Sequence, residues 1–326
     1  MSSQTKPKLR SPYADILRAF YEYKQLCGLK YNTGLIRLND LDNYLNSNFN
    51  EAKDLSLEDL GGWLTQRKTE GPKNFASRFG VYHQLYLYCL QNDISVFPDP
   101  GKLHAGFYQN DFVPYIYTHD EIRRFMKELD ADPYPNPTFQ RCAPLFFRIL
   151  YGTGLRSGEA LSLRVSDVVQ DKRYLTVRNG KYDNSRIVPY SDSLAAYIDD
   201  YINRVQYANE DPLFKSSTGR QLDHCLAYDW FRRILWKAGI PHPDKGNAPR
   251  MHDFRHTFAV HSLQNAVANG TDPNAFLPIL RVYLGHRNLA ATEQYLRLTS
   301  EMYPQMQDSV EKLTTNIIPE VTDYED

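Results

Sequence analysis

The sequence predicts a mainly α-helical protein with a small antiparallel β-hairpin or sheet in its second half, divided into two domains. Three observations carry this expectation. Apolar residues recur at helical spacing along most of the chain, and only two short runs have the composition of β-strands. Prolines and glycines crowd one stretch, residues 97–120, which is typical of a connection between domains. At 326 residues, the chain is long enough for two hydrophobic cores.

Four short helices are expected in the first hundred residues. Apolar side chains recur at helical spacing over residues 16–26 and again over residues 35–45. A weak capping box at residues 56–59 precedes a third helix. A fourth helix is expected over residues 72–90, with a proline in its first turn. The pattern predicts a small helical bundle over residues 1–100.

The second half of the chain combines helices with the β-like runs. A stronger capping box, Thr118 with Glu121, opens a helix after the connection. The runs 174–177 and 186–188 flank a polar turn and predict an antiparallel hairpin. We therefore divide the chain into an N-terminal domain (1–100), a linker (101–117), a second domain (118–300) and a C-terminal helix with an acidic tail (301–326).

The charge of the chain leaves nucleic-acid binding open. The net charge is −1 and the isoelectric point is about 6.8, which is less basic than a typical nucleic-acid-binding protein. Residues 299–326 hold seven acidic residues and one lysine, a charge of −6, so residues 1–298 carry +5. The body of the chain is mildly basic and its tail is acidic.

Other sequence features exclude several classes of protein. No apolar run approaches the roughly 18 residues that a membrane-spanning helix needs. The first residues lack the apolar segment of a secretory signal. The four cysteines form no CxxC pair and are expected to be reduced thiols of a cytoplasmic protein.

The first candidate motif lies at residues 152–159, after an apolar helix. On its own, it is consistent with a plain turn between helices in which Arg156 and Glu159 form a surface ion pair. The functional interpretation is that the two glycines let the backbone hold Arg156 at a concave surface. There its planar guanidinium could bind a phosphate through two hydrogen bonds.

Two further motifs contain cationic or histidine side chains. Lys181 lies in the polar turn of the hairpin, where a lysine in isolation is most often simply solvated. His252 and Arg255 share one face of a predicted helix and could both contact one anion. The alternative is a zinc site formed by His252 and His256, but the glutamate of the metalloprotease motif and a third ligand are missing.

The fourth motif joins His286 to Tyr295 nine residues later. The chain has 24 tyrosines, and any one of them is by default a core or surface residue. Tyr295 is singled out only by the motifs that precede it.

The four motifs, taken in order, resemble the active-site series of the tyrosine recombinase family. That family includes integrases of the lambda type, the Xer recombinases and transposon-borne relatives, and the resemblance extends over residues 10–300. The segment between Arg255 and Leu284 is longer than the family's usual pattern, and we expect it to lengthen a loop. The matching stretches are Tyr151–Leu163, Asn179–Lys181 with Arg186–Pro189, His252–Ala259 and Leu284–Tyr295.

The resemblance implies a site-specific DNA recombinase, and more narrowly the integrase of a mobile element. Tyr295 would attack the scissile phosphate and form a covalent 3′-phosphotyrosine, which keeps the energy of the broken bond, so that no ATP, metal or other cofactor is needed. Arg156 and Arg255 would hold the two non-bridging oxygens and stabilise the charge of the transition state.

The resemblance also assigns roles to the remaining motif residues. His286 would donate a hydrogen bond to a non-bridging oxygen, and His252 would assist proton movement at the Tyr295 hydroxyl. Lys181 would protonate the departing 5′ oxygen. Glu159 would support the site from behind the residues that contact DNA.

Partners and assembly follow from the same resemblance. The two domains would form a C-shaped clamp on double-stranded DNA, with a monomer in solution and a homo-tetramer in the synaptic complex. The apolar stripe within Met302–Leu313 would dock on a neighbouring protomer, or alternatively on its own domain. Lys73 and Arg78, on the fourth predicted helix, are candidate DNA contacts, although either could be a solvated charge. The expected location is the prokaryotic cytoplasm, associated with the nucleoid.

Three alternative functions remain open from the sequence. A type IB topoisomerase or a telomere-resolving relative would use the same chemistry without exchanging partners. A degenerate recombinase would bind DNA without cleaving it, although the full set of catalytic residue types argues against this. A zinc hydrolase would use His252 and His256.

Overall fold

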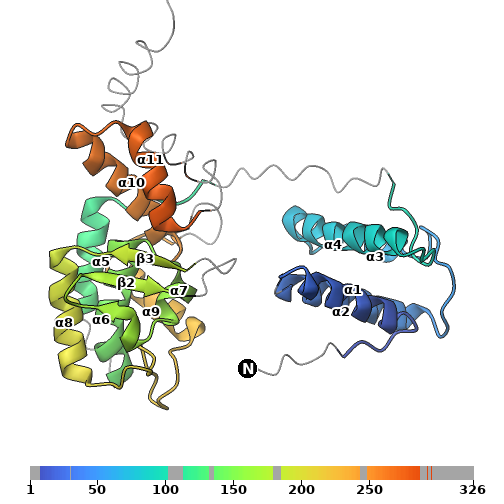
Figure 1. Cartoon of the computed structure of the whole chain (residues 1–326), viewed down its shortest axis with the longest axis horizontal. Coiled ribbons are helices and arrows are strands. Elements are labelled where there is room, and N and C mark those ends of the chain that lie inside the picture. Colours follow the sequence, from blue (N-terminus) through green and yellow to red (C-terminus); the bar gives the residue numbers. More distant parts are fainter. Residues whose placement is uncertain are drawn as a thin grey trace, which may run out of the picture. The chain divides into compact units, whose positions relative to one another are not determined.

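The chain divides into two compact units, Met1–Phe112 and Val113–Asp326, which we call the N-terminal and C-terminal units and describe separately (Figure 1). Within the described part, no helix is both long and apolar enough to cross a membrane. The structure, a computed structural model, describes residues 8–29, 31–101, 113–131, 136–178, 185–242, 248–286, 292 and 295.

The N-terminal unit is a helical bundle, as the apolar spacing predicts. Helices α1, α2 and α4 pack against one another in pairs around a core of leucines and aromatic side chains. Trp63, from the short helix α3, is fully buried in this core and lies 6.0 Å, centroid to centroid, from Tyr82. The helices are α1 (Ala14–Leu26), α2 (Asn32–Asn48), α3 (Gly61–Leu64) and α4 (Pro72–Gln91).

The weak capping box forms its hydrogen bonds but does not begin a helix. The Ser56 amide donates to the Asp59 carboxylate at 2.8 Å, and the Asp59 amide donates to the Ser56 hydroxyl at 3.2 Å. Residues 57–60 nevertheless form a turn, and α3 begins only at Gly61. The box therefore closes a turn that leads into the helix.

The C-terminal unit is built around helix α6, which packs against α5, α8, α9 and α10. The Asn136 side chain accepts hydrogen bonds from the first amides of α6, and Gly154 ends the helix in the left-handed conformation. The helices are α5 (His119–Ala131), α6 (Pro137–Thr153), α7 (Ser157–Leu161), η1 (Val165–Asp167), α8 (Asp192–Val205), α9 (His224–Lys237), α10 (Asp253–Ala268) and α11 (Pro273–Leu284).

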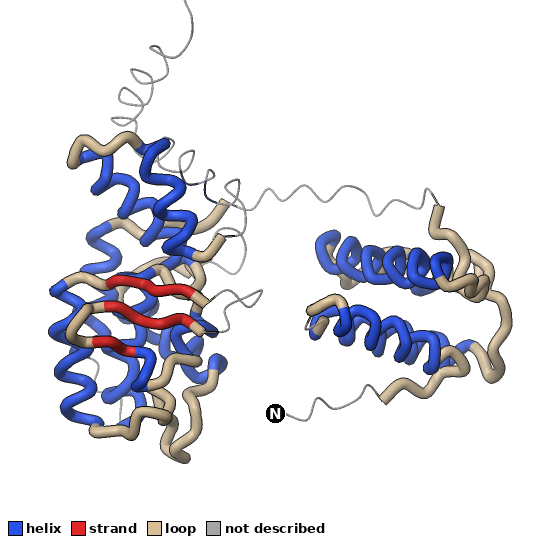
Figure 2. Tube along the Cα trace, in the orientation of Figure 1, coloured by secondary structure: helices blue, strands red, loops and turns tan. Residues whose placement is uncertain are grey.

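A three-stranded antiparallel sheet accompanies these helices, with strands in the order β1–β2–β3 (Figure 2). Leu175 pairs with Val188, and both side chains are fully buried on the inner face of the sheet. The predicted hairpin is present as β2 and β3, and β1 adds a short edge to it. The strands are β1 (Val168–Val169), β2 (Tyr174–Val177) and β3 (Arg186–Pro189).

An aromatic cluster fixes the start of α10 in the core. Phe254 is fully buried, stacks on Tyr117 at 5.0 Å and meets Phe125 edge-on at 5.2 Å between ring centroids. The Tyr117 amide donates to the Thr257 hydroxyl at 3.0 Å, one turn further along α10. The first turn of this helix is therefore held against both rotation and translation.

The expectation of a longer loop between Arg255 and Leu284 is wrong. Helix α10 continues to Ala268, and α11 begins at Pro273, so only residues 269–272 connect the two helices. The Asp272 side chain caps α11 by accepting from the Asn274 amide at 2.8 Å. Most of the residues between Arg255 and Leu284 are therefore helical.

Candidate active site

The side chain of Arg255 joins the three chain segments that carry the arginine and histidine motifs. It is 2% exposed and donates to the carbonyl oxygen of Gly154 at 2.9 Å and to that of Leu284 at 2.7 Å. A buried guanidinium needs such acceptors, because an unsatisfied charged group is costly inside a protein. The start of α10, the end of α6 and the end of α11 are thereby fixed around one cation.

Two glycines allow the backbone turns beside Arg255. Gly154 has φ of 60°, and a Cβ atom there would lie 2.6 Å from the Phe258 ring. Gly285 has φ of 69° and ends α11, so that the chain turns directly into His286. Any larger residue at Gly154 would be strained and would also clash, which explains the glycine in the first motif.

Arg156 is held in place by Glu159, three residues later. The Glu159 carboxylate accepts from the Arg156 backbone amide at 3.0 Å and from its guanidinium at 2.8 Å. The Arg156 side chain remains 28% exposed, so part of its guanidinium is open to an incoming anion. The ion pair expected from the sequence is present, and its glutamate is buried instead of lying on the surface.

Arg186 is a residue of this network that the sequence analysis did not identify. Its guanidinium donates to both oxygens of Glu159, at 3.2 and 2.9 Å, and to the Tyr283 carbonyl at 2.9 Å. Burial acts to raise the pKa of Glu159, but the hydrogen bonds and charges of Arg186 and Arg156 outweigh it and lower the pKa to about 2. One sequence signal could have found Arg186: it shares a strand face with the buried Val188, where a charged side chain needs a partner.

His252 and His286 lie close to both arginines. Desolvation, together with the charges of Arg255 and Arg156, lowers the pKa of His252 to about 4 and that of His286 to about 3. Both imidazoles are therefore neutral near pH 7 and can donate one hydrogen bond each. His286 lies 2.9 Å, through Nδ1, from the Thr292 hydroxyl, and His252 directly precedes the first residue of α10.

Tyr295 lies against two histidines and is 1% exposed. Its hydroxyl oxygen is 3.1 Å from Nδ1 of His256, and its ring stacks on His286 with centroids 6.1 Å apart. The family resemblance implies that His252 assists proton movement at this hydroxyl, and His256 was expected at most as a zinc ligand. The structure places His256 at the hydroxyl, 39 residues away in the sequence.

Not every predicted site residue can be placed. Lys181 lies outside the described residues, although the strands on both sides of its turn are described. The rings of His252 and His256 meet edge-on with centroids 5.0 Å apart. In the part of the chain that the structure describes, no three histidine, cysteine, aspartate or glutamate side chains come together as metal ligands would.

Comparison with known proteins decides what this arrangement is. Residues 116–302, more than half of the chain, match the model of the phage integrase family. The chain belongs to this family. It is a tyrosine recombinase, and enzymes of this kind cleave and rejoin DNA.

Individual relatives agree with the family match. The recombinase is 28% identical over 313 residues to y4rB, a candidate integrase/recombinase of Sinorhizobium fredii, with 93% of this chain and 98% of the relative covered. It is 28% identical over 296 residues to the tyrosine recombinase XerD of Oceanobacillus iheyensis, covering 86% and 93%. Its fold matches that of the XerH site-specific recombinase in a post-cleavage complex with difH DNA, with a TM-score of 0.66 at 19% identity over 95% and 91% of the two chains.

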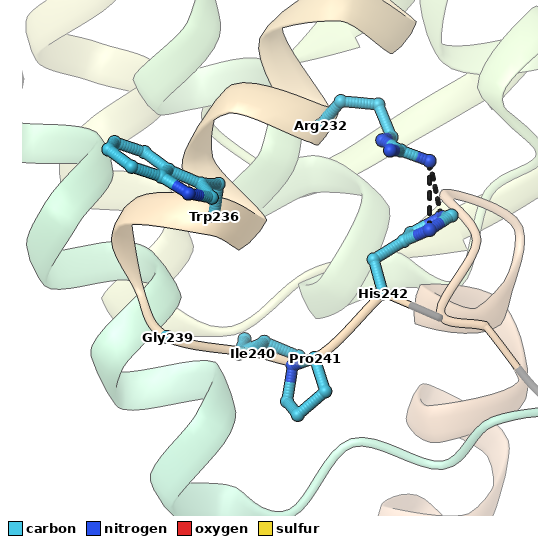
Figure 3. A pocket seen from close by; sticks show the side chains of 6 residues that line it. All are labelled: Arg232, Trp236, Gly239, Ile240, Pro241 and His242. Atoms are coloured by element: carbon cyan, nitrogen blue, oxygen red, sulfur yellow. Dashed lines mark hydrogen bonds between the residues drawn. The ribbon is translucent and has the colours of Figure 1, made fainter. Parts of the chain in front are cut away.

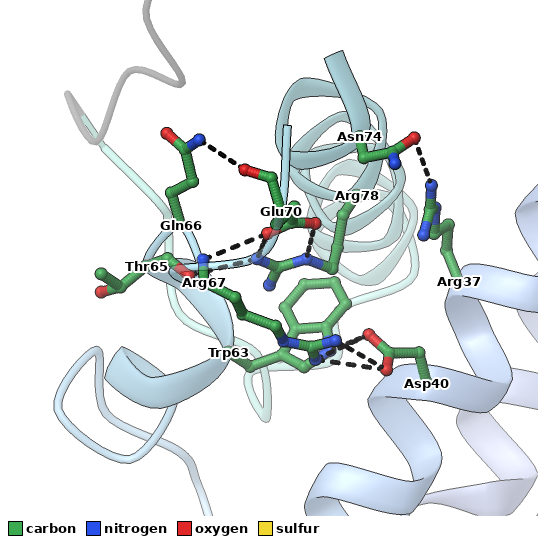
Figure 4. Close-up of polar contacts among 9 residues, drawn as sticks. All are labelled: Arg37, Asp40, Trp63, Thr65, Gln66, Arg67, Glu70, Asn74 and Arg78. Atoms are coloured by element: carbon green, nitrogen blue, oxygen red, sulfur yellow. Dashed lines mark hydrogen bonds and ion pairs between the residues drawn. The ribbon is translucent and has the colours of Figure 1, made fainter. Parts of the chain in front are cut away.

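The expectation that Arg78 contacts DNA is wrong. Its side chain is 1% exposed and binds the Glu70 carboxylate through two nitrogens, at 3.0 and 2.5 Å (Figure 4). The guanidinium also donates to the Thr65 carbonyl at 3.1 Å and lies 4.8 Å from the centre of the Trp63 ring. A cation already paired with a carboxylate and packed on an indole ring is not available to a phosphate. Lys73, in the first turn of α4, is exposed and remains a candidate.

A surface pocket of about 330 Å³ lies apart from these residues in the C-terminal unit of the recombinase (Figure 3). It is lined by the end of α9 and the chain that follows, including Trp236, which is 80% exposed. At the edge of the pocket, one guanidinium nitrogen of Arg232 lies 2.8 Å from Nδ1 of His242. None of the arginines or histidines around Tyr295 contributes to this pocket.

Proposed function

We propose that the recombinase cleaves DNA by attack of the Tyr295 hydroxyl on a scissile phosphate and rejoins it by the reverse reaction. The observation that carries this proposal is the position of Arg255, whose buried guanidinium ties together the segments that bear Arg156, His286 and His252. The charge of Tyr295, when ionised, acts on Arg255, so the nucleophile and this cation lie within electrostatic reach of each other.

The positive charge of the site suits a phosphodiester. The negative charge of a phosphodiester repels nucleophiles, and fixed cations must offset that charge as it builds up in the transition state. Arg156 and Arg255 supply these cations, and neutral His252 and His286 beside them supply hydrogen bonds to the non-bridging oxygens. Arg255 uses two of its donors for protein carbonyls, which leaves others for the phosphate.

Lys181 completes the proposed chemistry by the family pattern. The leaving 5′ alkoxide needs a proton, and Lys181, which lies between β2 and β3 in the sequence, would supply it. The phosphotyrosine that forms keeps the energy of the broken bond, so attack by a 5′-hydroxyl reseals the strand without ATP.

We infer from the relatives that the substrates are double-stranded recombination sites, probed by both units of the chain. The proposed assembly is a monomer in solution that forms a homo-tetramer on two sites, with the segment Met302–Leu313 docking on a neighbouring protomer. We place the enzyme in the prokaryotic cytoplasm as the integrase of a mobile element. The name of y4rB, whose full length aligns with this chain, supports the integrase assignment.

A covalent-trapping experiment tests the proposed function. Duplex oligonucleotides copied from the DNA that flanks the gene, nicked near each candidate cleavage point, should give an adduct that survives denaturation. Tyr295→Phe should bind the same duplex and form no adduct, because it lacks the attacking oxygen. An adduct formed by Tyr295→Phe at the normal rate would show that another residue is the nucleophile.

A further inference from the structure

The contact between His256 and Tyr295 points to a catalytic role for a histidine outside the predicted set. We propose that His256 accepts the proton of the Tyr295 hydroxyl as that oxygen attacks phosphorus, an inference that rests on the proposed function. Nδ1 of His256 lies 3.1 Å from the hydroxyl oxygen, and the two ring centroids are 5.7 Å apart. His252 lies one helical turn earlier, beside the phosphate-binding arginines, and is better placed to contact the phosphate.

The surroundings of His256 keep its imidazole neutral and able to accept a proton. Desolvation comes first, followed by the electrostatic effects of four neighbouring side chains, and together they lower the pKa of His256 to about 3. A neutral imidazole with its proton on Nε2 presents the Nδ1 lone pair to the hydroxyl. The charged and titratable groups that act on it are His252, Arg250 and Arg255 of the α10 region, and His286 after α11.

Bound substrate should strengthen this base. Two cations, Arg250 and Arg255, lower the pKa of His256, and of these Arg255 is also proposed to hold the scissile phosphate. A phosphodiester bound at Arg255 brings a negative charge close to His256, and a nearby negative charge raises the pKa of an imidazole. His256 therefore becomes a better proton acceptor when DNA is in place, which is when the reaction needs it.

The helix that carries His256 is held firmly enough for this role. Residues on both sides of it are buried: Arg255 binds two carbonyls, and the Thr257 hydroxyl accepts from the Tyr117 amide at 3.0 Å. Proton transfer requires the donor and acceptor at about hydrogen-bond distance, so a rigid mount favours it.

The proposed step balances in atoms and protons. The Tyr295 O–H bond breaks, its oxygen forms a bond to phosphorus, and the proton passes to Nδ1 of His256. The bond from phosphorus to the 5′ oxygen breaks at the same phosphorus, and that oxygen takes a proton from Lys181. In rejoining, the 5′-hydroxyl attacks and gives its proton to Lys181, which the first step left neutral, and His256 returns its proton to the departing tyrosine oxygen.

The test separates the proton taken from the nucleophile from the proton given to the leaving group. One substrate carries the normal 5′ oxygen at the scissile phosphate, and the other carries sulfur there. A thiolate leaves without a proton, because the pKa of a thiol, about 8.5, is far below that of an alcohol. The variants are His256→Ala, His256→Asn and Lys181→Ala. Asparagine can accept a hydrogen bond from the hydroxyl but cannot take up its proton.

We expect both His256 variants to form the covalent adduct about 100-fold more slowly on either substrate. The sulfur substrate should restore the rate of Lys181→Ala alone. The rate of His256→Ala should also rise with pH, because hydroxide replaces the lost base, while the wild-type rate should change much less. His261→Asn is the matched control: it lies on the same helix, with Nδ1 3.1 Å from the Tyr151 hydroxyl, and should cleave at the wild-type rate.

Two outcomes would overturn the proposal while leaving the proposed function intact. Wild-type rates in His256→Asn would mean that a hydrogen bond suffices and no proton is taken. Recovery of His256→Ala by the sulfur substrate would move its role to the leaving group. Adduct formation by Tyr295→Phe, in contrast, would refute the proposed function itself. Thermal melting of each variant shows that it is folded, and His256→Asn preserves the volume of the site best if His256→Ala unfolds.

Discussion

Among the residues that the structure describes, Arg78 and Arg255 are almost fully buried, and their charges are held in opposite ways. Arg78 in the N-terminal unit is 1% exposed and is neutralised by Glu70. Arg255 in the C-terminal unit is 2% exposed and is held by two neutral carbonyls, with no ion pair among the described residues. Burial and the nearby charge of Arg156 lower the pKa of Arg255 to about 10.

The difference separates a structural cation from a functional one. The Arg78 charge is cancelled where it lies, so the pair contributes to the fold and offers nothing to a ligand. The Arg255 charge is held in place without a carboxylate partner among the described residues, so the site keeps a positive charge that attracts an anion. Burial alone therefore says little about the role of an arginine, and the identity of its acceptors says more.

The largest expected effect comes from Arg255→Lys. A lysine keeps the charge but cannot donate to two carbonyls and a phosphate in the planar geometry of a guanidinium. We expect covalent-adduct formation on bound DNA to slow by about 1,000-fold, measured in single turnover. Arg78→Lys is the matched control and should leave that rate nearly unchanged. A loss of less than tenfold in Arg255→Lys would show that the uncancelled charge is not what the reaction uses.

The second effect is on the stability of the N-terminal unit. Arg78→Met leaves the Glu70 carboxylate buried without its partner and should cost about 3–5 kcal/mol of unfolding free energy. The double variant Arg78→Met with Glu70→Gln should recover much of this loss, because no charge is then stranded. Hydrogen exchange of α4 amides measures the loss of stability in the single variant and its recovery in the double variant. Additive losses in the double variant would contradict the ion-pair explanation.

The third prediction concerns the pH dependence given by Glu159, the carboxylate that serves Arg156 and Arg186. Its pKa is lowered from 4.5 to about 2, so folding favours the ionised form. The contribution, about 3 kcal/mol, is present above about pH 4.5 and is lost as the pH falls toward 2. Urea unfolding measures this effect: the free energy of unfolding should change less between pH 3 and pH 6 for Glu159→Gln than for the wild type. An equal change in both proteins would mean that other carboxylates determine the pH dependence of stability.

The smallest effect is expected at Lys73, the exposed cation on the helix that also carries Arg78. If Lys73 contacts a phosphate, Lys73→Ala should reduce the slope of log affinity against log salt by about 1, because one fewer counterion is released. Filter binding across a salt series measures the slope. An unchanged slope would place the DNA contacts of this unit on another surface.

The sequence predicted local structure well and long-range contacts poorly. The helices of both units and the β2–β3 hairpin follow from apolar spacing and capping residues, which act within one or two turns. Lys73 and Arg78 look alike in sequence, because burial of Arg78 depends on Glu70 and on the Thr65 carbonyl, which come from outside its helix. Only the fold brings these acceptors to it.

The active site shows the same limit. Its motifs are recognisable because each has a characteristic local spacing. The contact of His256 with Tyr295 and that of Arg186 with Glu159 join residues 39 and 27 positions apart, and no local pattern encodes either. From the sequence, His256 was considered only as a zinc ligand, and the strand position of Arg186 indicates a partner without naming it.

The hydrogen bond between His286 and Thr292 connects the position of the His286 ring to that of the segment that carries Tyr295. Thr292 is fully buried three residues before Tyr295, and its hydroxyl lies 2.9 Å from Nδ1 of His286. A shift of the segment that carries the nucleophile must therefore either turn the His286 ring or break its tether. In the proposed mechanism, the attacking oxygen and the His286 imidazole therefore reach their positions together, and a protomer whose Tyr295 is displaced would lose both the nucleophile and a hydrogen bond to the phosphate.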